Sequence, residues 1–122
     1  MITAVKHAVV PVQDQDRALK FYTEKLGFKV AVDAEFEGCP QRWIELKTPE
    51  GDTCVVLFTN DEHKDMIGKF SNIVFTCNDV VATTEQLKAS SVEVVEGPVQ
   101  AAWGVYSIFK DSEGNRFCLS ST

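Results

Sequence analysis

A repeated pattern limits the possible folds of this chain more than any other feature of its sequence. Residues 7–14, HAVVPVQD, and residues 72–79, NIVFTCND, are both short apolar runs that end at an aspartate. A helical pattern follows each run, and strand-like segments follow each helix. Repetition of this kind indicates that one supersecondary unit is used twice within the 122 residues.

The predicted helices begin directly after these aspartates, at 14–27 and 79–91. Asp14 or Asp16 is placed to accept hydrogen bonds from the free N–H groups of the first helix. Residues at helical spacing form one face of each helix. These are Ala18, Phe21, Tyr22 and Leu26 in the first helix, and Val80, Thr83, Thr84 and Leu87 in the second, weaker amphipath.

Three strands are expected after each helix, at 28–36, 41–47 and 53–59 and again at 92–97, 103–110 and 115–121. In each half the last two strands are joined by similar turns, TPEGD at 48–52 and DSEGN at 111–115. The glycine of each turn is expected to take the positive φ of a tight hairpin.

We therefore predict an α+β fold and a single domain made of two tandem βαβββ modules, at about residues 1–59 and 70–122. A polar linker or short helix at 60–69 joins them. One helix covers only one face of a four-stranded sheet. The other faces are expected to form a curved mixed sheet cup with the helices outside, and the cup is where a ligand would bind.

Composition excludes several functional classes. The net charge of −6 argues against nucleic acid as a partner. No apolar stretch approaches the ~18 residues of a membrane span, and no signal peptide pattern is present, so a cytoplasmic protein without a membrane partner is expected. Cysteine spacing shows no CxxC pair, and free thiols are expected at Cys39, Cys54, Cys77 and Cys118.

Two segments, DRALKFYTEKLGF at 16–28 and KDSEGNRF at 110–117, resemble the glyoxalase / bleomycin resistance / extradiol dioxygenase superfamily, also called vicinal oxygen chelate. The resemblance runs over nearly the whole chain and implies a homodimer. Members of this superfamily range from metal isomerases and dioxygenases to metal-free drug binders, so the function must be argued from the site.

In metal-dependent members, the resemblance implies four ligands on the first and last strands of each repeat. Carried over, these positions fall on His7, on Val55 or Val56, on Asn72 and on Cys118. A catalytic metal site uses about three protein ligands, and a neutral amide is a poor ligand for a transition metal. We therefore expect no cofactor. If a divalent metal does bind, His7 and Cys118 are its expected ligands.

Side chains on the predicted inner faces are expected to bind a small molecule. Aromatic residues there would stack on an aromatic or cationic ligand, and polar residues would orient it. Plain packing is the alternative for each aromatic residue. The expected set is His7, Trp43, Glu45, Phe58, Asn72, Trp103, Tyr106, Arg116 and Cys118.

Glu45 is also a candidate catalytic base. Strand alternation sends Ile44 and Leu46 to one face, so Glu45 lies on the other face beside Trp43. There it would act as a base, or it would be a rim residue paired with Lys47 or Arg116.

Three functions remain. The favoured one is a metal-free small-molecule binder with a degraded metal site. The alternative is a metal-dependent lyase or isomerase of the glyoxalase type with an atypical site. The third is a structural module whose cup is filled by side chains.

Overall fold

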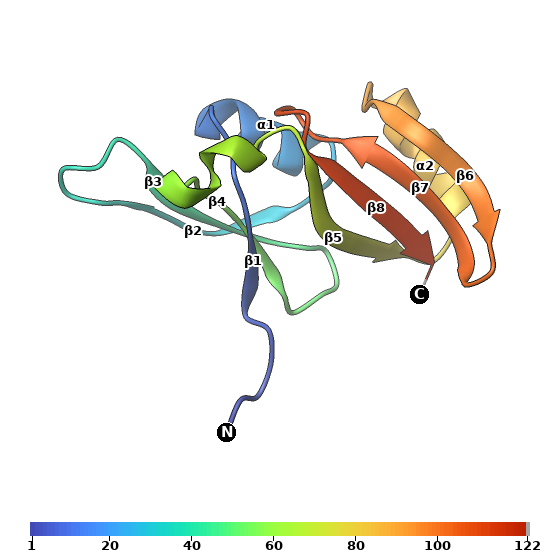
Figure 1. Ribbon diagram of the computed structural model, residues 1–122, viewed down its shortest axis with the longest axis horizontal. Helices are drawn as coiled ribbons and strands as arrows, with labels where there is room; N and C mark the ends of the chain where they lie inside the picture. The colour runs from blue at the N-terminus through green and yellow to red at the C-terminus, as the bar shows by residue number, and fades with distance from the viewer. Residues whose placement is uncertain (122) are drawn as a thin grey trace. The chain divides into compact units, whose positions relative to one another are not determined.

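The computed structural model describes residues 1–121 (Figure 1). The chain divides into two compact units, Met1–Ile67 and a second unit that begins at Gly68. The first unit contains β1 (His7–Val10), α1 (Gln15–Glu24), β2 (Lys29–Glu35), β3 (Arg42–Lys47), β4 (Cys54–Leu57) and the 3-10 helix η1 (Asp61–Met66). The second contains β5 (Phe70–Cys77), α2 (Val80–Ala89), β6 (Val94–Ala101), β7 (Gly104–Lys110) and β8 (Arg116–Ser121).

Each unit holds one open, four-stranded mixed sheet. The strand orders are β1-β4-β3-β2 and β5-β8-β7-β6. In both, the first strand runs parallel to its neighbour and the remaining pairs are antiparallel. The predicted α+β class and the repeated βαβββ order are confirmed. No helix within residues 1–121 is long and apolar enough to cross a membrane.

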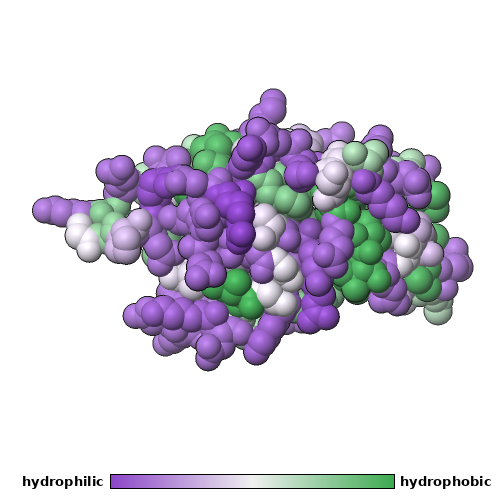
Figure 2. Space-filling model, turned by 90° about the horizontal axis from the view of Figure 1, so that it is seen from above, coloured by the Kyte–Doolittle hydropathy of each residue, from purple (hydrophilic) through white to green (hydrophobic). Residues whose placement is uncertain are grey.

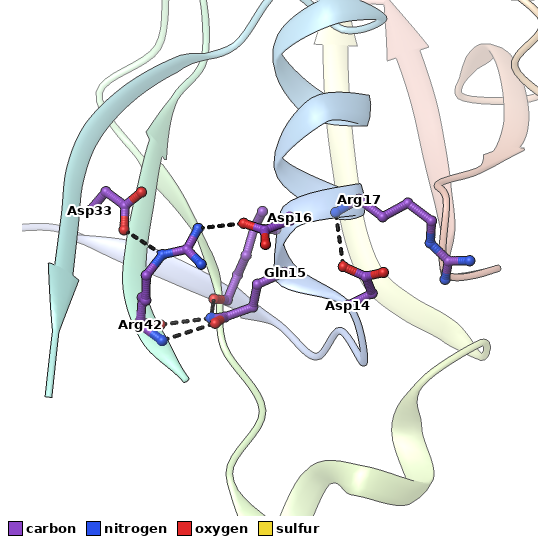
Figure 3. A network of polar contacts seen from close by, with 7 residues as sticks. Asp14, Gln15, Asp16, Arg17, Asp33 and Arg42 are labelled. Carbon is purple, nitrogen blue, oxygen red and sulfur yellow. Dashed lines mark hydrogen bonds and ion pairs between the residues drawn. The ribbon is translucent and has the colours of Figure 1, made fainter. Parts of the chain in front are cut away.

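Helix α1 is capped by Asp14, whose side chain accepts a 3.0 Å hydrogen bond from the N–H of Arg17 (Figure 3). Of the two aspartates that the sequence offered as caps, Asp14 is therefore the one that caps the helix. The helix packs against β4 and buries Ala18, Phe21 and Tyr22. On β3, Ile44 and Leu46 are fully buried, which is the alternation that the sequence indicated.

Polar contacts fix the start of α1 to the sheet (Figure 3). The side-chain amide of Gln15 donates to the backbone carbonyls of Arg42 and Leu57, at 2.6 and 2.8 Å. Asp16 does not cap the helix but pairs with the Arg42 guanidinium at 2.9 Å, as does Asp33. These two carboxylates raise the pKa of Arg42, with the hydrogen bond to Asp33 contributing most.

Helix α2 is capped by Asp79, which accepts from the N–H of Ala82, and it buries Val80, Thr84 and Leu87. The helix is weakly amphipathic, and its buried face also makes a polar contact with the sheet. Thr84 Oγ1 lies 2.8 Å from Ser107 Oγ on β7, and both residues are fully buried. A buried hydroxyl pair of this kind leaves neither group unsatisfied.

The two similar turns fold differently. Gly114 takes a φ of +81°, as expected, but the same prediction for Gly51 is wrong because its φ is not positive. Instead, the N–H of Gly51 donates to Thr48 Oγ1 at 3.1 Å. In the DSEGN turn the buried side chain of Asp111 accepts from the N–H groups of Glu113 and Asn115. Side-chain hydrogen bonds therefore shape both turns.

Candidate ligand-binding surfaces

Each sheet has one face that carries the buried core and an opposite face, here called its open face. The first open face is the side of β1-β4-β3-β2 that carries Trp43 and Glu45. Figure 2, which views the molecule from above, shows that hydrophilic residues cover much of the surface on that side and that hydrophobic residues reach it in separate patches. Aromatic side chains that gather on an open face are therefore candidates for binding.

An aromatic cluster lies on the first open face. The Trp43 ring lies 5.5 Å from the His7 ring and 5.4 Å from the Phe58 ring, measured between centroids. Phe36 joins them at 6.4 Å from Trp43 and 6.0 Å from Phe58. These separations are typical of edge-to-face and tilted aromatic pairs. The structure thus brings together three of the predicted ligand-binding residues and adds a fourth ring.

Glu45 is part of the same surface. The indole N–H of Trp43 donates a 2.9 Å hydrogen bond to Glu45 Oε1, and both side chains are half-buried. Glu45 has no ion pair with Lys47 or with any other Lys or Arg in residues 1–121, so the rim ion pair considered as its alternative is not formed. A fixed carboxylate beside aromatic rings is suited to hold a cationic group.

His7 carries an unsatisfied atom. Its Nδ1 is buried and has no hydrogen-bond partner among the residues that the structure describes. A buried polar atom without a partner costs free energy, so such atoms are rare in folded proteins. A bound molecule that hydrogen-bonds to the imidazole would remove this cost.

Phe36 was missed by sequence reasoning. It lies one residue beyond β2 and is 44% exposed. Its only signal was its position at the end of the predicted strand 28–36, and that position does not indicate which way the ring turns.

The second open face carries another aromatic pair. The Trp103 and Tyr106 rings are stacked, with centroids 5.3 Å apart and planes at 23°. Tyr106 Oη donates a 2.8 Å hydrogen bond to Glu96 Oε1, and this contact raises the pKa of Tyr106. Glu96 was not among the predicted site residues.

Cys118 and Arg116 lie on β8. Cys118 is buried and is paired with Val74 and Ile108 in the sheet. Burial, followed by the charge of Glu96, raises the pKa of the Cys118 thiol, which favours its protonated form. Arg116 is half-buried and is paired with Phe70 and Lys110.

Asn72 does not occupy the place in its sheet that His7 occupies in the first. His7 pairs with Cys54 two positions before the Val9–Val56 pair. In the second sheet Arg116, two residues before Cys118 on β8, pairs with Phe70, which lies four residues before Val74 on β5. The β5 register therefore shifts between Phe70 and Val74. Asn72 lies in this irregular segment, exposed and with a φ of +62°. The sequence offset therefore misplaced the counterpart of His7.

The residues at the four ligand positions that the family resemblance implies do not fit a divalent metal. The same registers match Val56, rather than Val55, to Cys118. Val56 has no donor atom, and neither has Phe70, which the register makes the counterpart of His7. Burial, followed by the charge of Glu96, raises the pKa of Cys118, which disfavours the thiolate that binds metals. No group of three or more His, Cys, Asp or Glu side chains suited to a metal occurs in residues 1–121.

Similarity to known proteins agrees with this fold. Residues 4–119 match the model of the Glyoxalase/Bleomycin resistance protein/Dioxygenase superfamily. The chain is 35% identical to the uncharacterized protein YetH of Bacillus subtilis, over 98% of both chains. It also resembles the crystal structure of TnmS3, described as an antibiotic binding protein from a Streptomyces species. That likeness has a TM-score of 0.84 and 31% identity, over 98% of this chain and 96% of that one.

A third relative is named as an enzyme. The chain is 31% identical to the probable lactoylglutathione lyase, chloroplastic, of Arabidopsis thaliana, over 93% of this chain but only 34% of that protein. Both the family model and the similarity to YetH extend over almost the full length described above. The chain therefore belongs to the glyoxalase/bleomycin resistance protein/dioxygenase superfamily.

Proposed function

We propose that this chain captures flat aromatic cations on its first open face and that it does so without a metal ion. The observation that carries the proposal is the Trp43–Glu45 hydrogen bond at the edge of the aromatic cluster. It holds a carboxylate beside ring surfaces, which are the two features that an aromatic cation needs.

The aromatic rings supply the apolar part of the site. Phe36 is 44% exposed and contacts both Trp43 and Phe58, so a flat ligand can reach the cluster from this side. Each aromatic pair contributes about 0.5–1.5 kcal/mol beyond the burial of its area. Stacking alone would not distinguish a cation from a neutral ring of the same size.

Charge selection is assigned to Glu45. Its Oε1 accepts from the Trp43 indole, and its second oxygen remains available to a ligand's N–H groups. Hydrogen bonds to charged groups are stronger than those between neutral groups, at about 1.5–3 kcal/mol. The net charge of −6 also favours the approach of a cation over that of an anion.

His7 supplies a further contact in this proposal. The burial of Nδ1 without a partner would be relieved by a hydrogen bond to the ligand or by a small reorientation of the ring. The role is that of an orienting group, and no bond to the ligand is made or broken. Binding of this kind requires no metal.

The comparisons support a binding function in general terms. TnmS3 is described as an antibiotic binding protein, and its fold matches that of this chain over nearly the full length. The predicted ligand contacts in the second unit stay predictions; they are Asn72, Trp103, Tyr106, Arg116 and Cys118.

We also propose a cytoplasmic location. All four cysteines are free thiols, as is usual in a reducing compartment.

One observation favours a second function, a metal-dependent lyase or isomerase: the similarity to the Arabidopsis protein named as a lyase. Glu45 would then be the general base. The donor set described above does not support the required metal. Elemental analysis of the purified chain separates the two functions, because about one equivalent of bound Zn, Ni, Mn or Fe would favour the enzyme.

The proposed function is tested by calorimetric titration with three molecules that share one ring system but differ in charge. These are 2-naphthamidine (a cation), 2-naphthamide (neutral) and 2-naphthoate (an anion). We expect affinity to fall in that order. Glu45→Gln is expected to weaken binding of the amidine about tenfold while leaving that of the amide nearly unchanged.

The matched control is Glu24→Gln, which makes the same charge change at the exposed end of α1. It is expected to bind the amidine as the parent does. Equal affinities for all three molecules, or no binding of any of them, would contradict the proposal.

A further inference from the structure

The two sheets can be aligned residue by residue through their registers. Val10 pairs with Leu57 in the first sheet, and Phe75 pairs with Leu119 in the second. Both strand residues precede their capping aspartates, Asp14 and Asp79, by the same number of positions. Leu57 and Leu119 are therefore equivalent.

The alignment extends to the neighbouring strand of each sheet. Leu57 pairs with Ile44 on β3, and Leu119 pairs with Ser107 on β7. The residues directly before these are Trp43 and Tyr106. The repeat thus places a hydrogen-bonding aromatic residue at the same position of both open faces.

Both aromatic residues donate to a carboxylate, but the carboxylates come from different strands. Trp43 donates to Glu45 on its own strand, at 2.9 Å. Glu45 corresponds to Ile108, and the second carboxylate is Glu96, which pairs with Ile108 from the adjacent strand β6. Tyr106 reaches it at 2.8 Å. Each open face therefore has an aromatic side chain that donates to a glutamate, from the same strand in the first sheet and from the adjacent strand in the second.

We propose that Glu96, Tyr106 and Trp103 form a second, independent site for organic cations on the second open face. The ligand chemistry rests on the proposed function of the first face, and the second site is the new element. Its class of ligand is a planar cation with N–H donors, such as an aromatic amidinium.

Three observations support the second site. Trp103 is 62% exposed although its ring is stacked on Tyr106, so one side of the aromatic pair is open to a ligand. Tyr106 fixes one oxygen of Glu96 and leaves the other for a cation. No Lys or Arg within the described residues forms an ion pair with Glu96, so its charge is not neutralised by the chain.

The electrostatic effects in this unit agree with the geometry. The hydrogen bond to Glu96 raises the pKa of Tyr106, because loss of the phenol proton would place a second negative charge beside that carboxylate. The same potential favours a bound cation.

The two tryptophans allow each site to be observed separately. The chain has only Trp43 and Trp103, so a nitrogen-15 correlation spectrum contains two indole signals, which Trp43→Phe and Trp103→Phe assign. Titration with 2-naphthamidine is expected to shift both signals. In Glu96→Gln, the apparent Kd at the Trp103 signal is expected to rise about threefold to tenfold, with the Trp43 signal unchanged.

Control variants sharpen the test. Glu85→Gln makes the same charge change at an exposed position of α2 and is expected to leave both titrations unchanged. Tyr106→Phe keeps the ring but removes the hydroxyl that holds Glu96, so the Kd at Trp103 is expected to rise. 2-Naphthamide is expected to shift the Trp103 signal more weakly than the amidine does.

Failure of each proposal has its own signature. A Trp103 signal that does not respond to the amidine, or that responds equally in Glu96→Gln, overturns the second site. So does a result in which Glu45→Gln and Glu96→Gln each abolish both shifts, because one shared ligand would then be bound. A silent Trp43 signal with a responding Trp103 signal overturns only the function proposed for the first face.

Discussion

The indole N–H of Trp43 and the carboxylate of Glu45, two residues apart on β3, are joined by a 2.9 Å hydrogen bond. Neighbours at this spacing point to the same side of a strand, opposite the fully buried Ile44 and Leu46. One strand therefore presents the core on one side and the candidate site on the other. Changes on the two sides are expected to have different effects.

Truncation on the core side should destabilise the fold. Ile44→Ala removes a fully buried side chain and is expected to lower the free energy of unfolding by about 2–5 kcal/mol. Val30→Ala, at a residue that is 48% exposed on β2, is expected to change it by less than about 0.5 kcal/mol. Urea denaturation measures both, and equal losses would contradict the assigned faces.

The start of α1 offers a second stability test. Asp14→Ala removes the accepting side chain of the cap and is expected to cost about 1 kcal/mol of unfolding free energy. Asp14→Ser should recover most of this loss, because serine also accepts from the first turn. Thermal unfolding compares the two variants. If serine is no better than alanine, the hydrogen bond is not the source of the stability.

The raised pKa of Tyr106 makes part of the stability of the second unit depend on pH. The pKa of Tyr106 is raised, so its contribution to stability is fully present below the unfolded pKa and is lost as pH rises through the folded one. Glu96→Gln is expected to lower the pKa of Tyr106, measured by carbon-13 titration of the ring. An unchanged titration would mean that Glu96 does not hold the phenol.

The raised pKa of Cys118 should also slow its alkylation, because the thiolate is the reactive form. Iodoacetamide is expected to modify Cys118 more slowly than half-exposed Cys39, Cys54 or Cys77. Mass spectrometry over time gives the order, and modification of Cys118 first would contradict the assigned burial.

The homodimer implied by the family resemblance predicts self-association through β2. Every residue of Lys29–Glu35 is exposed, and β2 is one of the two edge strands of its sheet. Antiparallel pairing of two copies around Val32 would place Lys29 opposite Glu35, which is favourable. Sedimentation should therefore find a dimer that Val32→Lys weakens and Val81→Lys, on exposed α2, does not. A monomer at all concentrations would exclude this interface.

Much of the fold could be predicted because local signals agreed with one another. The two apolar runs, the capping aspartates and the alternation along 41–47 depend on short stretches of sequence. For that reason the sequence predicted the helices, the order of the strands along the chain and the shared face of Trp43 and Glu45.

The remaining features depend on register and on side-chain direction. Asn72 was matched to His7 by counting, but the irregular segment between Phe70 and Val74 shifts the pairing. Glu96 was overlooked because the β6 register shifts on both sides of it. Such shifts arise from packing across strands and leave no clear mark in one sequence. The ring of Phe36 lies beyond its strand, where alternation gives no guidance.

Metal dependence of amidine binding is the most direct test of the central claim, that Trp43 and Glu45 capture an aromatic cation without a metal. Calorimetry should compare 2-naphthamidine binding to chain treated with a chelator and to the same chain with Zn²⁺, Ni²⁺ or Mn²⁺ restored. We predict the same affinity in each case, and about a tenfold loss in Glu45→Gln. Binding that appears only after metal is restored, or that is indifferent to Glu45→Gln, would contradict that claim.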